Sequence, residues 1–240
     1  MSRFSRPENG EVHLHSAHFI HDFSQIIHSA RYLSDEEATR ADRFKCEESM
    51  RHFRVARLFL RTILSGYLDC TPEKVPISIS IHGKPFLAGD EHHLRFNMAH
   101  SGDRLLLAVS QSHDVGIDLE TIATGRPFKQ MARLVFSPRE QHELNAVNSA
   151  ELPPLFSRYW VRREACLKAA GSGFSLPRST TFDVCGTTHA PHRFSINQNG
   201  FQFTVADIDA PDGFCAAIAV TGHHSASLRE PVWMTNKLTD

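Results

Sequence analysis

The chain has 240 residues, of which 41% are hydrophobic and 22% are charged, and its formal net charge is −1. These values are typical of a globular protein with one large domain or two small ones. The neutral balance gives no argument for nucleic acid or an anionic membrane as a partner. No apolar run reaches the roughly 20 residues that a membrane-spanning helix needs.

Cysteine and histidine usage narrows the possibilities further. The five cysteines are odd in number and form no CxxC pair, which argues against a disulfide framework and a zinc site and favours a reducing cytoplasm. The first 19 residues lack the apolar stretch of a signal peptide, so we expect a cytoplasmic protein. Four histidines near the N-terminus have no zinc-site spacing and are expected to be surface side chains: His13, His15, His18 and His21.

Residues 33–65 predict helical structure with a possible break near 47–49. Ser34 followed by Glu37 forms a capping box, and Gly66 is the expected stop. The basic residues of this region are expected on the side opposite the apolar ones. Strand-like segments follow, separated by turns at HGKP and HSGD; they lie at 77–82, 93–99, 104–110 and 115–120.

The second part of the chain repeats this order. Ser137 caps one predicted helix, and LFSRYWVRREACLKAAG (155–171) forms another. Strand-like segments then lie at 179–185, 192–199, 201–207 and 214–220, with NG and DG turn signals between them. Helices followed by a meander, twice over, predict an α+β protein with a pseudo-twofold duplication, each half packing helices on a small, mainly antiparallel sheet. We place the halves at 1–120 and 121–224 and expect an irregular tail at 225–240.

Two carboxylates stand two residues apart in VGIDLE. The strand period puts Asp118 and Glu120 on one face, about 6–7 Å apart at their Cα atoms. Two such charges side by side favour a cation between them, and oxygen ligands select Mg²⁺, Mn²⁺ or Ca²⁺ over zinc or copper. A solvated strand face is the alternative interpretation.

The helix at 155–171 carries a second pair of charges. Trp160, Glu164 and Lys168 recur at helical spacing and therefore share one stripe. This stripe is either a surface ion pair or a carboxylate and an ammonium aimed together into a site. His100 before the SGD turn and Lys84 in the GKP turn are each also explained as ordinary turn residues.

Taken together and in order, the motifs GKPFL, FNMAHSGD, VGIDLE and WVRREACLKAAGSGFSLP are more specific. They resemble the surfactin-type (Sfp-type) 4′-phosphopantetheinyl transferase family, over roughly residues 33–220. The resemblance implies two α+β halves with coenzyme A, the co-substrate, bound in the cleft between them. It also implies transfer of the phosphopantetheine arm to a serine of apo acyl or peptidyl carrier proteins, with release of adenosine 3′,5′-bisphosphate. The family uses Mg²⁺, for which Mn²⁺ is an alternative, and its two-halved members are monomers.

The resemblance also implies roles for single residues. Asp118, Glu120 and Glu164 would ligate Mg²⁺, and Glu164 would also be the base toward the serine hydroxyl, directly or through a metal-bound water. Lys168 would face the pyrophosphate, and Trp160 would pack beneath the pair and orient the helix. The remaining coenzyme A contacts would come from the first half: Arg40, Arg51, His52, Lys84 and His100. Arg57 and Arg61 are expected to be structural ion-pair partners instead.

Several positions depart from the family pattern. Ala99 replaces a serine, Arg163 replaces a lysine before the metal-binding glutamate, and His52 replaces an arginine. In the loop GSGFSLP, Ser172 and Phe174 replace lysine and leucine. None of these changes touches the three carboxylates, so they are expected to alter affinity rather than abolish activity.

Residues 121–136 are the expected docking surface for an acidic carrier protein, because they mix apolar with basic side chains, among them Phe128, Lys129, Met131 and Arg133. The alternative is a helix that packs its apolar side into the second half. Two other functions stay open: a metal-dependent phosphodiester enzyme acting on nucleic acid, and a non-catalytic coenzyme A-binding protein. The sequence leaves the pathway open among fatty acid, polyketide, nonribosomal peptide and siderophore synthesis.

Overall fold

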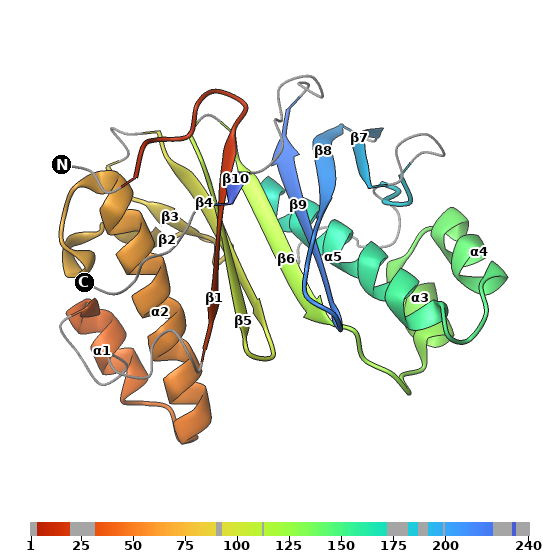
Figure 1. The fold of residues 1–240 in the computed structure, drawn as a ribbon, viewed down its shortest axis with the longest axis horizontal. Coiled ribbons are helices and arrows are strands. Elements are labelled where there is room, and N and C mark those ends of the chain that lie inside the picture. Colours follow the sequence, from red (N-terminus) through yellow and green to blue (C-terminus); the bar gives the residue numbers. More distant parts are fainter. Residues whose placement is uncertain are drawn as a thin grey trace.

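Two four-stranded sheets lie side by side, and each packs against one long helix (Figure 1). The computed structural model describes residues 4–19, 32–89, 93–111, 113–171, 182–186, 192–198, 200–222 and 232–233. The first sheet has the order β10-β1-β5-β4, from β1 (Val12–His18), β4 (Arg95–Ser101), β5 (Arg104–Ser110) and β10 (Val232–Trp233). The second has the order β6-β9-β8-β7, from β6 (Val115–Thr121), β7 (Arg193–Gln198), β8 (Phe201–Ile208) and β9 (Phe214–Thr221). Their pairs are antiparallel except β1 with β10.

The starts of two helices are the ones that the sequence predicted from capping residues. The helices are α1 (Asp35–Ala41), α2 (Glu47–Leu68), α3 (Phe128–Val135), α4 (Pro138–Ala146) and α5 (Leu152–Ala170), with a short 3₁₀ helix at Pro72–Lys74. The expected capping box at Ser34 forms, and the expected cap at Ser137 forms as part of a second capping box with Glu140. Gly66 was wrongly expected to end a helix: it is buried inside α2, which ends at Leu68 before the left-handed residue Asp69. Within the described residues, no helix is long and apolar enough to cross a membrane.

The duplication is confirmed by the connectivity of the two halves. In the first, β1 is followed by α2, β4 and β5, and β1 pairs with β5. In the second, β6 is followed by α5, β8 and β9, and β6 pairs with β9. Each half therefore begins with a strand that pairs with its last one. β6 hydrogen-bonds to β9 and belongs to the second sheet, although most of it lies before the boundary expected at residue 120.

Three further segments differ from expectation. The hairpin of β2 (Ile77–Ile79) and β3 (Pro85–Leu87) is a separate two-stranded sheet and displays Lys84 in its turn. Residues 182–186 form no strand; the Val184 N–H donates to Glu140 instead of a ladder partner. In the tail, Val232 and Trp233 pair with β1, and its other residues lie outside the described ones.

The leading strand β1 was missed because its histidines were taken for surface residues. His13 and His15 are buried, and their ring nitrogens lie 2.7 and 2.8 Å from the hydroxyl of Tyr67 on α2. Burial lowers the pKa of His13 against the opposing effect of Glu11, which favours the neutral form of the ring. The N-terminal histidines thus belong partly to the core of the first half.

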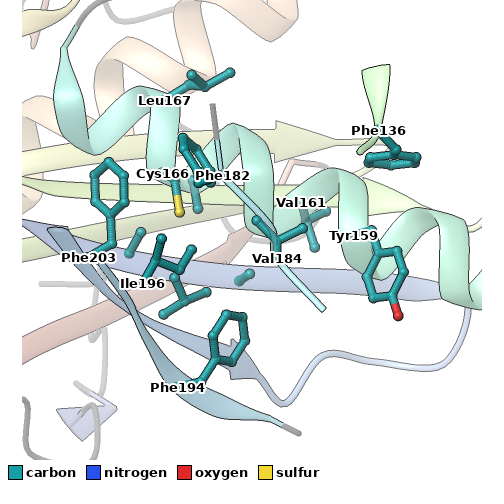
Figure 2. Packing of buried hydrophobic residues seen from close by; sticks show 14 of the residues in the cluster. Phe136, Tyr159, Val161, Cys166, Leu167, Phe182, Val184, Phe194, Ile196 and Phe203 are labelled. Atoms are coloured by element: carbon teal, nitrogen blue, oxygen red, sulfur yellow. The ribbon is translucent and has the colours of Figure 1, made fainter. Parts of the chain in front are cut away.

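The two halves share a hydrophobic core. One cluster lies between α2 and the first sheet, and a second lies between α5 and the second sheet, where Figure 2 shows Val161, Cys166 and Leu167 of α5 among aromatic side chains. A third cluster combines residues of both sheets, including Leu106, Ala108, Ile117, Leu119 and Ile218. Burial on this scale makes the contact between the halves a permanent part of the fold.

Candidate functional site

The stripe of α5 that the sequence singled out faces open space. Trp160, Glu164 and Lys168 are partly exposed, whereas the residues between them, 161–163 and 165–167, are all buried. Glu164 and Lys168 line a cavity of about 240 Å³ together with Lys84 and Asn97. Trp160 lines a smaller pocket, of about 90 Å³, together with Glu120. The stripe therefore forms one wall of both spaces.

A glycine on β6 lets α5 approach the carboxylate strand. A Cβ atom at Gly116 would lie 2.0 Å from the carbonyl oxygen of Ala165 and 2.3 Å from the nitrogen of Ala169. No side chain can occupy that position without moving the backbone. Gly116 thus brings the helix turn that carries Lys168 directly against the strand that carries Asp118.

Asp118 is the most perturbed carboxylate of the site. It is only 5% exposed, and its Oδ1 accepts from the ammonium of Lys168 at 2.6 Å. Burial raises the pKa of Asp118 to about 6, against the opposing effect of Lys168 and with a further rise from the charges of Glu120 and Glu164. Its Oδ2 is buried and has no hydrogen-bond partner among the described residues.

The donor set is suited to a hard divalent cation. An unpartnered buried carboxylate oxygen, beside two further carboxylates that repel it, is a surplus of negative charge that such a cation would neutralise. Over the described residues, however, no group of three or more His, Cys, Asp or Glu side chains is gathered into a metal-holding cluster. The ammonium of Lys168, which also donates to the Ile117 carbonyl at 3.2 Å, occupies Oδ1 of Asp118 in its place.

Two histidines of the first half meet near this group. The ring of Phe19 lies 4.6 Å from that of His52 on α2 and 5.9 Å from that of His100 on β4. Burial lowers the pKa of His100, and the nearby positive charges of His52 and Lys168 lower it further. His52, His100 and Lys168 thus converge from three elements, and together they form a region suited to anions.

Lys84, which is expected to face the nucleotide, joins the two halves through hydrogen bonds of its ammonium. Its ammonium donates to the carbonyl oxygens of Val115 at 3.3 Å and Ala169 at 3.2 Å, so the first-half hairpin is bound to β6 and to the end of α5. Burial lowers the pKa of this ammonium. Lys84 also lines both the 240 Å³ cavity and a neighbouring one of about 440 Å³, so its stem stays beside open space.

The arginines of the first half divide into two groups. Arg57 and Arg61 are structural, as expected: both pair with Glu37, and Arg61 also donates to three backbone carbonyls after α2. Arg40 and Arg51 are exposed; Arg40 lies 5.2 Å over the ring of Phe53, and Arg51 lies 3.9 Å from Glu47. These two remain candidates for contacts with a phosphate.

Residues 121–136, the expected docking segment, have features of both alternatives: a side packed into the second half and an exposed basic surface. Phe128 is buried, and its ring lies 5.0 Å from that of Phe156, as the packing alternative requires. Lys129 and Arg133 are exposed, and Met131 is partly buried. The 90 Å³ pocket is lined by Phe128 and Met131 beside Glu120 and Trp160, so this segment adjoins the carboxylate strand.

The structure also places two further residues of the α5 motif. Arg163, which replaces a lysine of the family pattern, is buried against Glu140 at 2.7 Å and donates to the Phe182 carbonyl. Trp160 stacks on Phe156 in the wall of the smaller pocket. Ala99 is buried in the core shared by the halves. Ser172 and Phe174 lie outside the described residues.

Sequence reasoning missed three residues that shape this site: Gly116, Asn97 and Ser101. The side chains of Asn97 and Ser101 accept hydrogen bonds from β6 at Ile117 and Thr121. The available signals were the glycine of VGIDLE and the polar residues that flank His100 in FNMAHS.

Comparison with known proteins matches both halves to one group of enzymes. Residues 21–112 match a family model described as 4′-phosphopantetheinyl transferase, N-terminal, and residues 114–219 match the 4′-phosphopantetheinyl transferase superfamily. The 4′-phosphopantetheinyl transferase HetI of Nostoc sp. is 34% identical over 215 residues, which are 88% of each chain. AcpT of Escherichia coli K12 is 38% identical over 111 residues, 46% of this chain and 55% of its own. A 4′-phosphopantetheinyl transferase of Bacillus subtilis is 29% identical over 147 residues, 60% of this chain and 63% of its own.

Proposed function

The chain belongs to the 4′-phosphopantetheinyl transferase superfamily, and from this premise we propose that it transfers the phosphopantetheine arm of coenzyme A to a carrier-protein serine with the aid of Mg²⁺. The observation that supports this best is Asp118: buried, raised in pKa, with one oxygen on Lys168 and the other unpartnered. The proposed product is adenosine 3′,5′-bisphosphate.

Asp118, Glu120 and Glu164 are the proposed Mg²⁺ ligands, and Mn²⁺ would suit the same oxygens. The bound ion would supply a Lewis acid that neutralises charge on the pyrophosphate. On coenzyme A binding, the side chain of Lys168 would change position. Its ammonium would leave the Asp118 oxygen that it now contacts and would bind the pyrophosphate oxygens of coenzyme A instead. Its 32% exposed side chain lines the cavity, so this exchange needs no change of backbone.

The transfer step requires a base and a stabilised leaving group. The serine oxygen forms a bond to the β-phosphorus while the bond from that phosphorus to the bridging oxygen breaks, and the nucleotide keeps the electron pair. Glu164 would take the serine proton, since it lines the cavity one turn from Lys168. Lys168 would stabilise the developing charge on the leaving oxygen.

The first half would bind the nucleotide end of coenzyme A. His100 and His52 converge with Lys168, and a phosphate dianion among them would favour the protonated form of His100. Lys84 would contact the nucleotide side of the same cavity, and Arg40 and Arg51 would contact the 3′-phosphate from the exposed side of the helices.

The carrier would dock on the segment that adjoins the smaller pocket. Lys129 and Arg133 are exposed there, and Phe128 and Met131 border the pocket beside Glu120. Basic side chains around an apolar recess suit an acidic helical partner. We further propose that the protein acts as a monomer in the cytoplasm.

Replacing Glu164 by glutamine tests the proposed base. The variant keeps the size of the side chain and loses its proton affinity, so transfer should be abolished while coenzyme A binding stays measurable by calorimetry. Glu143→Gln, on the neighbouring helix α4, is the matched control and should retain activity. Turnover by Glu164→Gln equal to that of the wild type would show that Glu164 is not the base.

A further inference from the structure

Side chains, not a backbone ladder, join the two sheets. β4 is the edge strand of the first sheet and β6 the edge strand of the second, and the two lie side by side. The side-chain oxygen of Asn97 accepts from the Ile117 N–H at 2.9 Å, and the hydroxyl of Ser101 accepts from the Thr121 N–H at 3.0 Å. Both acceptors satisfy N–H groups that an unpaired edge strand would otherwise leave without a partner.

These two bonds fix one register between the strands. Each joins residues 20 positions apart, so β4 and β6 run in the same direction without an offset between the two contacts. The bonded positions 117 and 121 lie on either side of Asp118 and Glu120, and His100 lies between Asn97 and Ser101 on β4. A slip by one residue would turn both carboxylates to the opposite face.

Asn97 and Ser101, which we call the clamp residues, also lie close to the reacting groups. Asn97 is 7% exposed and lines the cavity with Glu164 and Lys168. The hydroxyl of Ser101 lies 3.4 Å from a carboxylate oxygen of Glu120. Hydrogen bonds from the side chains of one half therefore reach the backbone and a carboxylate of the other at the level of the site.

We propose that Asn97 and Ser101 are positioning residues, which hold the Asp118 and Glu120 pair of the second half in register with His100 of the first. The inference rests on the proposed function, since the value of that register is that the metal ligands and the anion-binding region meet. Neither residue needs to touch coenzyme A. Loss of the Asn97 oxygen leaves the Ile117 N–H buried without a partner and frees the strand to shift.

Two substitutions at Asn97 separate positioning from folding. Asn97→Leu removes the acceptor at similar volume, and Asn97→Asp keeps an oxygen for the Ile117 N–H. Val109→Ala, in the hydrophobic cluster between α2 and the first sheet, is a matched control for loss of stability. The Mg²⁺ concentration for half-maximal transfer and the kcat are measured separately, and amide exchange of residues 115–121 is followed by mass spectrometry.

Asn97→Leu should raise the half-saturating Mg²⁺ concentration by about tenfold or more, the usual effect of losing support for a metal ligand. It should also accelerate exchange in 115–121, whereas Asn97→Asp should restore both values to near those of the wild type. Val109→Ala should lower the Tm without changing the Mg²⁺ dependence. An Mg²⁺ dependence of Asn97→Leu equal to that of Val109→Ala, or no rescue by aspartate, would overturn the inference.

Ser101 provides the second test if Asn97→Leu does not fold. Ser101→Ala removes the acceptor at a partly exposed site, and Ser101→Thr retains a hydroxyl. The alanine variant should raise the half-saturating Mg²⁺ concentration and the threonine variant should not; equal values for the two variants would overturn the inference. A wild-type chain that transfers nothing refutes the proposed function instead, and the exchange comparison of Asn97→Leu with Asn97→Asp then decides whether Asn97 holds β6.

Discussion

Replacing Asp118 by asparagine should stabilise the metal-free protein while it removes transfer activity. Asp118 is 5% exposed, and the pKa of its carboxyl rises from 3.8 to about 6 even with Lys168 beside it. At about 1.4 kcal/mol per pH unit, this rise means that ionised Asp118 lowers the free energy of unfolding by about 3 kcal/mol relative to the neutral acid. Asparagine has the shape of the neutral acid and carries no charge.

The sign of the effect depends on pH in a defined way. Because the folded pKa is raised, stability is fully present below pH 3.8 and is lost as the pH rises through about 6. The difference between Asp118→Asn and the wild type should therefore grow between about pH 4 and 6 and then level off at up to about 3 kcal/mol. Urea unfolding in EDTA at pH 5, 6, 7 and 8 measures it. Addition of Mg²⁺ and coenzyme A should stabilise the wild type only.

Two results would refute this reasoning. If Asp118→Asn were less stable than the wild type at pH 8, the Lys168 ion pair would outweigh the burial of the charge. If the difference did not change between pH 5 and 8, Asp118 would not titrate in this range, and the argument that its surplus charge awaits a cation would fail.

Three further predictions follow from the same geometry. Gly116→Ala should lower the free energy of unfolding by about 1–3 kcal/mol or more, because its Cβ would lie 2.0 Å from a carbonyl oxygen. Urea unfolding measures this change, and an unchanged free energy of unfolding would contradict the prediction. Coenzyme A affinity, measured by calorimetry, should rise as the pH falls from 8 to 6, because a bound phosphate favours protonation of His100, whose pKa is lowered in the free protein. If the affinity of His100→Gln depended on pH to the same extent, a group other than His100 would cause the effect. Reversing both charges at Lys129 and Arg133 should raise the KM for the carrier by roughly tenfold at low salt with little change in kcat; a KM equal to that of the wild type would place docking on another surface.

Local signals in the sequence predicted the parts of the fold that depend on near neighbours. The Ser34 and Ser137 caps and the turn that displays Lys84 each need only a few adjacent residues. Gly66 shows the limit of such rules: packing of α2 on the first sheet carries the helix past a residue with poor intrinsic propensity.

The errors came from partners far away in the chain. His13 is a core residue because it meets Tyr67, 54 positions later, and without that contact the strand pattern around it suggests a polar surface. Arg163 pairs with Glu140, 23 positions earlier, and nothing in the local sequence around Arg163 indicates that partner. The hydrogen bonds that Asn97 and Ser101 accept from β6 likewise depend on β4 and β6 lying side by side, which the sequence does not show.

Intact-protein mass spectrometry of an apo carrier protein, incubated with this chain, coenzyme A and Mg²⁺, tests the central claim most directly. The account predicts a gain of one phosphopantetheine per carrier, which EDTA prevents and which Glu164→Gln does not produce. Acyl and peptidyl carriers should be compared, since the sequence leaves the pathway open. No mass gain on any carrier, by a chain that binds coenzyme A, would contradict the proposed transfer and favour a non-catalytic coenzyme A-binding protein.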